Sequence, residues 1–250
     1  MRSGFSLVEL STVLVILGLL TGGILAGQNL IRAAELRSVV KEYQNYQAAV
    51  MTFRDKYFAI PGDISNATDF WGAATCPTAA GTGTATCNGN GDGKINDAAA
   101  GAQFGEKFTF WQHLANAGLL EGSYTGMAGP DGIQDGDVGV NIARSRISNA
   151  GWYVSIINTG DAYNYNIDFG THLVFGKQAS GNNAAANKAL TPEELWNVDT
   201  KIDDGKPGRG KLIATYWPTC TLSINNSDYD KPYDLQETGV ECIFRVRSGF

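Results

Sequence analysis

The chain has 250 residues, a formal net charge of −6 and 43% hydrophobic residues. An acidic chain without a basic patch is not expected to bind nucleic acid. Its length fits one globular domain plus an N-terminal helix. Four cysteines without a Cys-x-x-Cys motif are typical of an oxidising compartment rather than of a metal site.

The N-terminal part is a long apolar run that follows a leader of four residues. From Phe5 to Gly27 the only charged residue is Glu9. A helix of this length would be about 35 Å long, enough to cross a bilayer core of about 30 Å. A carboxylate in such a segment costs a few kcal/mol and usually marks a function or a partner. The processing signal, Gly4 before Phe5, lies in front of the apolar run, whereas a secretory signal peptide is cut behind it.

This arrangement of Gly4, Phe5, an apolar helix and Glu9 resembles the prepilin signature, which type IV pilins share with the pseudopilins of type II secretion. The resemblance is strongest over the first 30 or so residues. It implies that a prepilin peptidase cleaves between Gly4 and Phe5 and that the new amine of Phe5 is N-methylated. It also implies that Glu9 pairs with such an amine on a neighbouring subunit during assembly. Gly18 falls on the family's helix-loosening glycine, while Ala26 stands where the family usually has proline.

Apolar residues continue at three- and four-residue steps from Ile31 to Tyr57, which predicts an amphipathic helix that ends before Pro61-Gly62. One helix from Phe5 to Tyr57 would be about 80 Å long. Two helices broken near Gly27 would fit the pattern as well.

The fold class that the resemblance implies is α+β, with this long helix packed on an antiparallel sheet and with long loops. The expected divisions are a leader (1–4), a membrane and filament-core helix (5–27), its amphipathic continuation (28–60) and a pilin-like globular domain (61–250). The implied partners are other pilin or pseudopilin subunits, the prepilin peptidase, an inner-membrane assembly platform and, before assembly, membrane lipid.

The basic residues that follow the apolar run, Arg32, Arg37 and Lys41, would place the large domain in the cytoplasm under the positive-inside rule. The prepilin signature and the cysteines favour the opposite orientation. We therefore expect a single-pass protein of the bacterial inner membrane with its globular domain outside the cytoplasm, and after assembly a periplasmic or cell-surface filament.

Residues 62–103 are poor in large apolar side chains and predict a long surface loop, with Phe70-Trp71 as an anchor. The four cysteines allow three pairings. We favour Cys76–Cys87, which would staple this loop, with Cys220–Cys242. The second pair resembles the disulfide-bounded region near the C-terminus of type IV pilins.

One stretch of this loop is rich in Gly and Asn and matches the first part of an EF-hand-like calcium loop. Its alternate positions are Asn88, Asn90, Asp92, Lys94 and Asn96. Ala99 occupies the twelfth position, where a carboxylate is expected, so a calcium ion would need ligands from elsewhere in the chain. Calcium-stabilised loops occur among pseudopilins, which favours the ion, but a Gly-Asn turn without an ion fits equally well. No other cofactor is expected.

The remaining pattern predicts a helix near residues 104–118 and strands over 152–157, 167–175, 212–217 and 243–246. Thr191-Pro192-Glu193-Glu194 is a capping box that opens a short helix through Ile202. His113 and His172 are the only histidines, so a histidine-rich metal site is not expected.

These features together favour a structural subunit of a type IV pilus or of a type II secretion-like filament, either a minor pilin or a pseudopilin. The alternative is a filament-tip or membrane-anchored adhesin that binds its ligand through the loops around Trp71, Tyr163 and Tyr165. An enzyme is not expected, because the sequence contains no Gly-x-Ser-x-Gly elbow, His-Glu-x-x-His motif, Walker loop or complete dinucleotide fingerprint.

Overall fold

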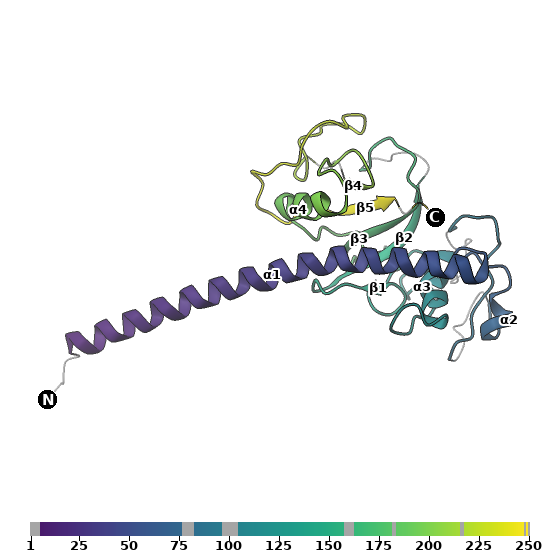
Figure 1. Cartoon of the computed structure of the whole chain (residues 1–250), viewed down its shortest axis with the longest axis horizontal. Coiled ribbons are helices and arrows are strands. Elements are labelled where there is room, and N and C mark those ends of the chain that lie inside the picture. Colours follow the sequence, from purple (N-terminus) through teal and green to yellow (C-terminus); the bar gives the residue numbers. More distant parts are fainter. Residues whose placement is uncertain are drawn as a thin grey trace.

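The structure is a computed structural model that describes residues 6–76, 83–96, 105–157, 163–181, 184–215, 218–247 and 249. It is an α+β protein in which a long N-terminal helix packs along a five-stranded antiparallel sheet (Figure 1). The elements in chain order are α1 (Leu7–Tyr57), α2 (Ala67–Trp71), α3 (Glu106–Asn116), β1 (Ala143–Arg144), β2 (Ala150–Ile157), β3 (Gly170–Lys177), α4 (Pro192–Ile202), β4 (Leu212–Ala214) and β5 (Phe244–Arg247).

Helix α1 is one continuous helix of 51 residues, so the alternative of two helices broken near Gly27 is wrong. It begins with a capping box that the sequence analysis did not identify. The Glu9 carboxylate accepts a hydrogen bond from the Ser6 N–H (2.8 Å), and Ser6 Oγ accepts one from the Val8 N–H (3.2 Å). The helix ends at Tyr57, because Phe58 adopts the left-handed conformation (φ 54°).

The sheet has the strand order β1-β2-β3-β5-β4, and all neighbours are antiparallel. After β3 the chain forms α4 and then the edge strand β4, and it returns as β5 between β3 and β4. In this register Phe175 of β3 lies opposite both Trp152 of β2 and Phe244 of β5. These three aromatic rings are buried on the sheet face that meets α1.

The main core lies where the second half of α1 meets the sheet and α3. Tyr46 of α1 packs between Trp111 of α3 and Trp152 of β2, with ring centroids 5.1 and 5.9 Å apart in edge-to-face geometry. Such aromatic pairs add about 0.5–1.5 kcal/mol each beyond the burial of their surface. The contacts fix α1 to the globular domain along its second half only.

Both disulfides are present in the pairing favoured from the sequence, Cys76–Cys87 and Cys220–Cys242. The predicted helices and strands are present with bounds shifted by a few residues, and β1 and α2 are additional. Strand β4 ends at Ala214, and Trp217, the end of the predicted strand, lies outside the described residues.

Candidate functional site

The first half of α1, which we call the bare half (Leu7–Ile31), forms a large exposed apolar surface. Figure 1 shows it projecting away from the globular domain. It is long and apolar enough to cross a membrane, and none of its most apolar window is buried in the protein, so it is not a core helix. A bare helix of this length exposes an apolar surface on the order of 1,000 Å². The largest apolar patch on a typical soluble monomer is smaller, about 300–600 Å². Its exposed large apolar side chains are Leu7, Val8, Leu10, Val13, Leu14, Val15, Ile16, Leu17, Leu19, Leu20, Ile24, Leu25, Leu30 and Ile31.

Three hydroxyl groups on the bare half are satisfied within the helix itself. Ser11 and Thr12 donate hydrogen bonds to the Val8 carbonyl (2.9 and 3.1 Å), and Thr21 donates to the Leu17 carbonyl (2.9 Å). Hydrogen-bonding groups that face a hydrocarbon environment need such internal partners. The bare half therefore meets the requirements of lipid, or of a dry interface between helices, with one ionisable group, Glu9.

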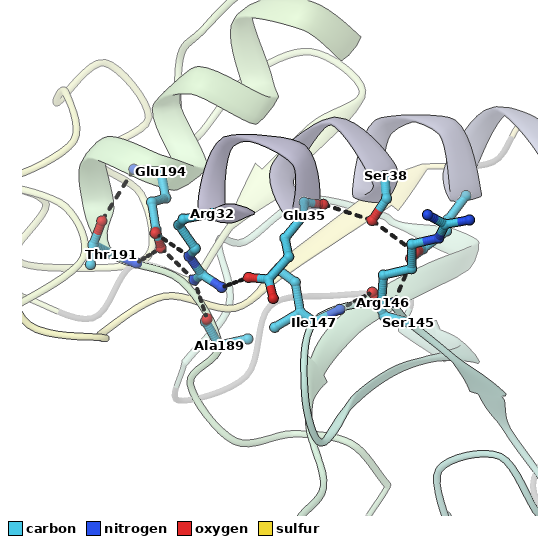
Figure 2. A network of polar contacts seen from close by, with 10 residues as sticks. Arg32, Glu35, Ser38, Ser145, Arg146, Ile147, Ala189, Thr191 and Glu194 are labelled. Atoms are coloured by element: carbon cyan, nitrogen blue, oxygen red, sulfur yellow. Dashed lines mark hydrogen bonds and ion pairs between the residues drawn. The ribbon is translucent and has the colours of Figure 1, made fainter. Parts of the chain in front are cut away.

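The bare half ends where Arg32 ties α1 to the start of α4 (Figure 2). The guanidinium of Arg32 makes a bidentate ion pair with Glu194, from Nε to Oε1 (2.5 Å) and from Nη2 to Oε2 (2.8 Å). It also pairs with Glu35 one turn further along α1 (2.9 Å). Planar bidentate pairs fix direction as well as distance. Arg32 thus ties α1 to α4 at the point where the bare half begins.

The Arg32–Glu194 pair is half-buried, and its charges are strongly coupled. The hydrogen bond that Arg32 donates to Glu194 is the main reason why the pKa of Arg32 lies above its ordinary value. Burial alone would raise the pKa of Glu194, but the hydrogen bonds from Arg32 and from the Thr191 amide outweigh it, so the pKa of Glu194 is lowered. Glu194 therefore completes the capping box of α4 with Thr191 and holds Arg32 with the same carboxylate.

Another acidic residue of α1, Glu42, fastens the helix to the sheet. Its carboxylate accepts hydrogen bonds from the Trp152 indole (2.8 Å), from the Arg146 backbone N–H (3.0 Å) and from the Ser38 hydroxyl (3.2 Å). Together with Arg32, Glu42 fastens α1 to the globular domain.

Residues Gly4 and Phe5, at which processing was predicted, lie outside the described residues. Glu9, the predicted assembly residue, is exposed, and its carboxylate caps its own helix through Ser6. Any pairing with a neighbouring subunit would compete with this cap or use the other carboxylate oxygen.

The predicted calcium loop lies at the opposite end of α1. Three carboxylates converge there, from Asp63, Asp92 and Glu106, with one ligand oxygen from each within 4.8 Å of the others. Asp92 was predicted from the loop pattern. Asp63 follows the end of α1 and Glu106 begins α3, so only the tertiary fold brings them to the loop.

The backbone of the loop wraps around the two additional acids. Asp63 accepts the N–H groups of Gly91 (2.7 Å) and Gly93 (2.8 Å), and Glu106 accepts those of Asn90 (2.9 Å) and Asn96 (2.7 Å). Burial is the main reason why the pKa of Asp63 and the pKa of Glu106 are raised, and the charge of Asp92 adds to both. These N–H groups stabilise the carboxylates without neutralising them.

The side chains fit a calcium ion in part. Asn90 and Asn96 both lie within hydrogen-bonding distance of Asp92 (3.2 and 2.9 Å), so their amides line the cluster. The Asn88 side chain instead accepts the Thr68 N–H at the start of α2 (2.9 Å). Lys94 contributes its backbone N–H to Asp92 (2.9 Å). The three acids supply the hard oxygen ligands that calcium prefers, whereas Asn90 and Asn96 face Asp92 with their amide nitrogens and would have to turn to offer their oxygens.

Two glycines allow the loop to approach the end of α1. A Cβ on Gly89 would lie 2.3 Å from the Gly62 carbonyl oxygen, and a Cβ on Gly62 (φ 91°) would lie 2.4 Å from that of Glu106. Both positions exclude larger residues. The Gly62 N–H donates to Nδ1 of His113 (3.0 Å), which leaves Nε2–H to donate to the Thr86 hydroxyl (2.9 Å). His113 is thus a buried structural link between α3, this turn and the disulfide-closed loop.

The aromatic residues of the adhesin alternative do not form one exposed surface. Tyr165 is 0% exposed, whereas Tyr163 is 58% exposed. Trp71 packs on the core against Phe53 and His113, with ring centroids 6.2 and 5.2 Å away. Two of the three rings are therefore committed to packing.

No protein-family model, curated protein or solved structure matches the chain. Its class therefore follows from its architecture, a pilin-like α+β fold with a long N-terminal apolar helix packed on an antiparallel sheet. One membrane-length helix in the described part of the chain, together with two disulfides, is typical of a single-pass or extracytoplasmic protein.

Proposed function

We propose that the chain is a structural subunit of a helical filament outside the cytoplasm, either a minor pilin of a type IV pilus or a pseudopilin of a type II secretion-like system. The observation that carries this proposal is the bare half of α1. It is apolar on all sides and of membrane length, yet it continues without a break into a helix that is packed in the domain.

This surface suits two successive environments. Before assembly, inner-membrane lipid covers the bare half, and in the filament the bare halves of neighbouring subunits replace the lipid. At Gly18, Gly22, Gly23 and Gly27, apart from the adjacent residues and the neighbouring turns of the helix backbone, no described atom lies within 4 Å of the place where a Cβ would be. Neighbouring helices can therefore approach closely along these positions.

Processing and assembly follow from the same proposal. The prepilin peptidase cuts between Gly4 and Phe5, and the inner-membrane assembly platform moves the subunit from lipid into the filament. Glu9 pairs with the methylated amine of a neighbouring subunit and sets the register, because an unpaired carboxylate in an apolar interface is costly. The role in this proposal is structural rather than catalytic.

Two substitutions at Glu9 separate its assembly role from its capping role. Glu9→Gln removes the charge but keeps a capping-box side chain, whereas Glu9→Ala removes both. We expect both variants to insert in the membrane and to be absent from sheared filaments and from cross-linked subunit ladders. Ladders from Glu9→Gln at wild-type level would show that the charge has no part in assembly. Ser6→Ala is the matched control, because it removes the hydrogen bond from the Val8 N–H to Ser6 Oγ and leaves the Glu9 charge in place.

A further inference from the structure

Three basic side chains gather beside the part of α1 that follows the bare half. Arg37 and Lys41 are exposed on α1, and Arg146 is exposed in the turn between β1 and β2. Together they line a surface pocket of about 320 Å³, which is large enough for a phosphate and the groups attached to it. We call this pocket the cationic pocket. Its other lining residues are Ala34, Ser38, Glu42 and Asn45.

The cationic pocket carries positive charge that the described part of the chain does not neutralise. No described carboxylate forms an ion pair with Arg37, Lys41 or Arg146. Glu42 is the only acid in the pocket lining, and both of its oxygens already accept hydrogen bonds, one of them from the Trp152 indole. Three cations against one carboxylate leave two positive charges unbalanced, in a chain whose net charge is −6. The pocket therefore fits an anion.

The structure gives different roles to the basic residues that follow the apolar run. Arg32 is committed to Glu194 and Glu35, so it belongs to the fold. Arg37 and Lys41 have no such partner in the described chain and are available to a ligand. The turn that carries Arg146 is held beside them, because the Arg146 N–H donates to Glu42 (3.0 Å); Figure 2 shows Arg146 next to α1.

The position of the pocket along α1 indicates where the anion comes from. The bare half is about 37 Å long and a bilayer core about 30 Å thick, so Ile31 lies at or beyond the edge of the core. Arg37 follows Ile31 by six residues, or about 9 Å, and helical side chains lean towards the N-terminus, which here is towards the membrane. The headgroup layer is about 5–8 Å thick on each side. The Arg37 guanidinium therefore reaches the level of the lipid phosphates, and Lys41 lies one turn further out.

We propose that the cationic pocket binds the phosphate of an anionic lipid headgroup, an inference that rests on the membrane-inserted stage of the proposed function. Arginine binds phosphate oxygens in a bidentate manner, and two of the three cations are arginines. Each cation near an anionic membrane surface contributes about fivefold to the affinity. The bound lipid holds the exposed side of α1 against the membrane surface and is released when the subunit leaves the membrane.

The test titrates the full chain, in non-ionic detergent at low salt, with phosphatidylglycerol or with phosphatidylcholine, and counts the bound lipids by native mass spectrometry. Both lipids carry a phosphate, but only phosphatidylglycerol has a net negative charge. We expect the wild type to bind phosphatidylglycerol at least about tenfold more tightly than phosphatidylcholine. The double variant Arg37→Gln with Lys41→Gln should reduce this preference to less than about twofold, because two cations are lost. Arg146→Gln alone should lower the affinity for phosphatidylglycerol by about fivefold.

Two controls separate this site from a general effect of charge and from a site for free phosphate. Arg54→Gln with Lys56→Gln removes the same charge from exposed positions of α1 that lie about 20 Å or more beyond Lys41, and it should bind as the wild type does. Glycerol 3-phosphate carries the phosphate without the acyl chains and should displace the lipid only at far higher concentration. Displacement at equal concentration would contradict the lipid as the ligand.

Equal binding of both lipids by the wild type would overturn the proposal, as would an equal loss of preference in the Arg54 and Lys56 control. Unchanged lipid binding in the Arg37 and Lys41 variant, together with weaker cross-linked subunit ladders, would assign the pocket to a neighbouring subunit and would also overturn it. The filament role is tested separately by processing and assembly. A chain that is processed and assembles but shows no lipid preference would contradict this inference alone.

Discussion

Acid should destabilise this protein by a mechanism that can be traced to its two histidines. Both His113 and His172 are fully buried, and burial lowers the pKa of each to about 3 from an ordinary value of 6.5. Between these two values the unfolded chain binds a proton at each histidine that the folded chain does not. The free energy of unfolding therefore falls as the pH falls from about 6.5 towards about 3.

The size of the effect follows from the linkage relation. Each histidine contributes a slope of about 1.4 kcal/mol per pH unit where its unfolded form is protonated and its folded form is neutral. Over the whole window the loss is at most about 5 kcal/mol for each residue, against a total stability of about 5–15 kcal/mol for a typical domain. Carboxylates titrate over the same range, so the informative quantity is the difference between wild type and variant.

The variants are His113→Asn and His172→Asn, which replace each imidazole by a neutral group. Asn keeps an acceptor for the Gly62 N–H at position 113 and a donor for the Gly170 carbonyl at position 172. Urea unfolding of the full chain in detergent, followed by tryptophan fluorescence from pH 4 to 6, should give each variant a slope shallower than wild type by about 1.4 kcal/mol per pH unit. Slopes equal to wild type would refute the assignment of the acid response to these histidines.

Three further predictions concern the ties that hold the subunit together. In a double-mutant cycle, Arg32→Ala and Glu194→Ala should show a coupling of about 1–2 kcal/mol, because the pair is bidentate and half-buried. The exposed Arg209–Asp230 pair is the control and should show no measurable coupling. An equally small coupling between Arg32 and Glu194 would contradict the conclusion that this pair ties α1 to α4. Replacing both Cys220 and Cys242 by Ala should cost about 3 kcal/mol of stability, because the disulfide removes loop-closure entropy over a separation of 22 residues. A cost of 1 kcal/mol lowers the melting temperature by at least about 2–3 °C, so a smaller change in the variant would contradict this prediction. Chelation of calcium should lower the melting temperature of the wild type more than that of Asp92→Asn, and an equal shift in both would remove the ion from the Asp92 loop.

The sequence predicted those parts of the fold that follow from local patterns. The run from Leu7 to Tyr57 is long and periodic, so the helix could be expected. The helix continues through Gly27 because glycines alone do not end a helix. The Thr191–Glu194 capping box likewise marked the start of α4 correctly. Of the two disulfides, Cys76–Cys87 was favoured because the loop it closes has little core of its own, and Cys220–Cys242 because of the resemblance to type IV pilins.

What the sequence did not predict depends on contacts between distant segments. Asp63 and Glu106 join the Asp92 loop because the end of α1 and the start of α3 meet there, and no spacing along the chain encodes that meeting. The Ser6–Glu9 capping box could have been found from its Ser-x-x-Glu pattern, but the membrane interpretation of Glu9 obscured it.

The central claim is that the chain is processed and assembled as a filament subunit through the bare half of α1. Mass spectrometry of the N-terminal peptide, from the membrane fraction and from filaments sheared off the cell surface, tests it most directly. We predict a chain that begins at N-methylated Phe5. Recovery of this chain in the sheared material would indicate a pilus. Its recovery in the membrane fraction alone would indicate a pseudopilin or a scarce minor pilin. A chain that still begins with Met1-Arg2-Ser3-Gly4 in both fractions would contradict the claim.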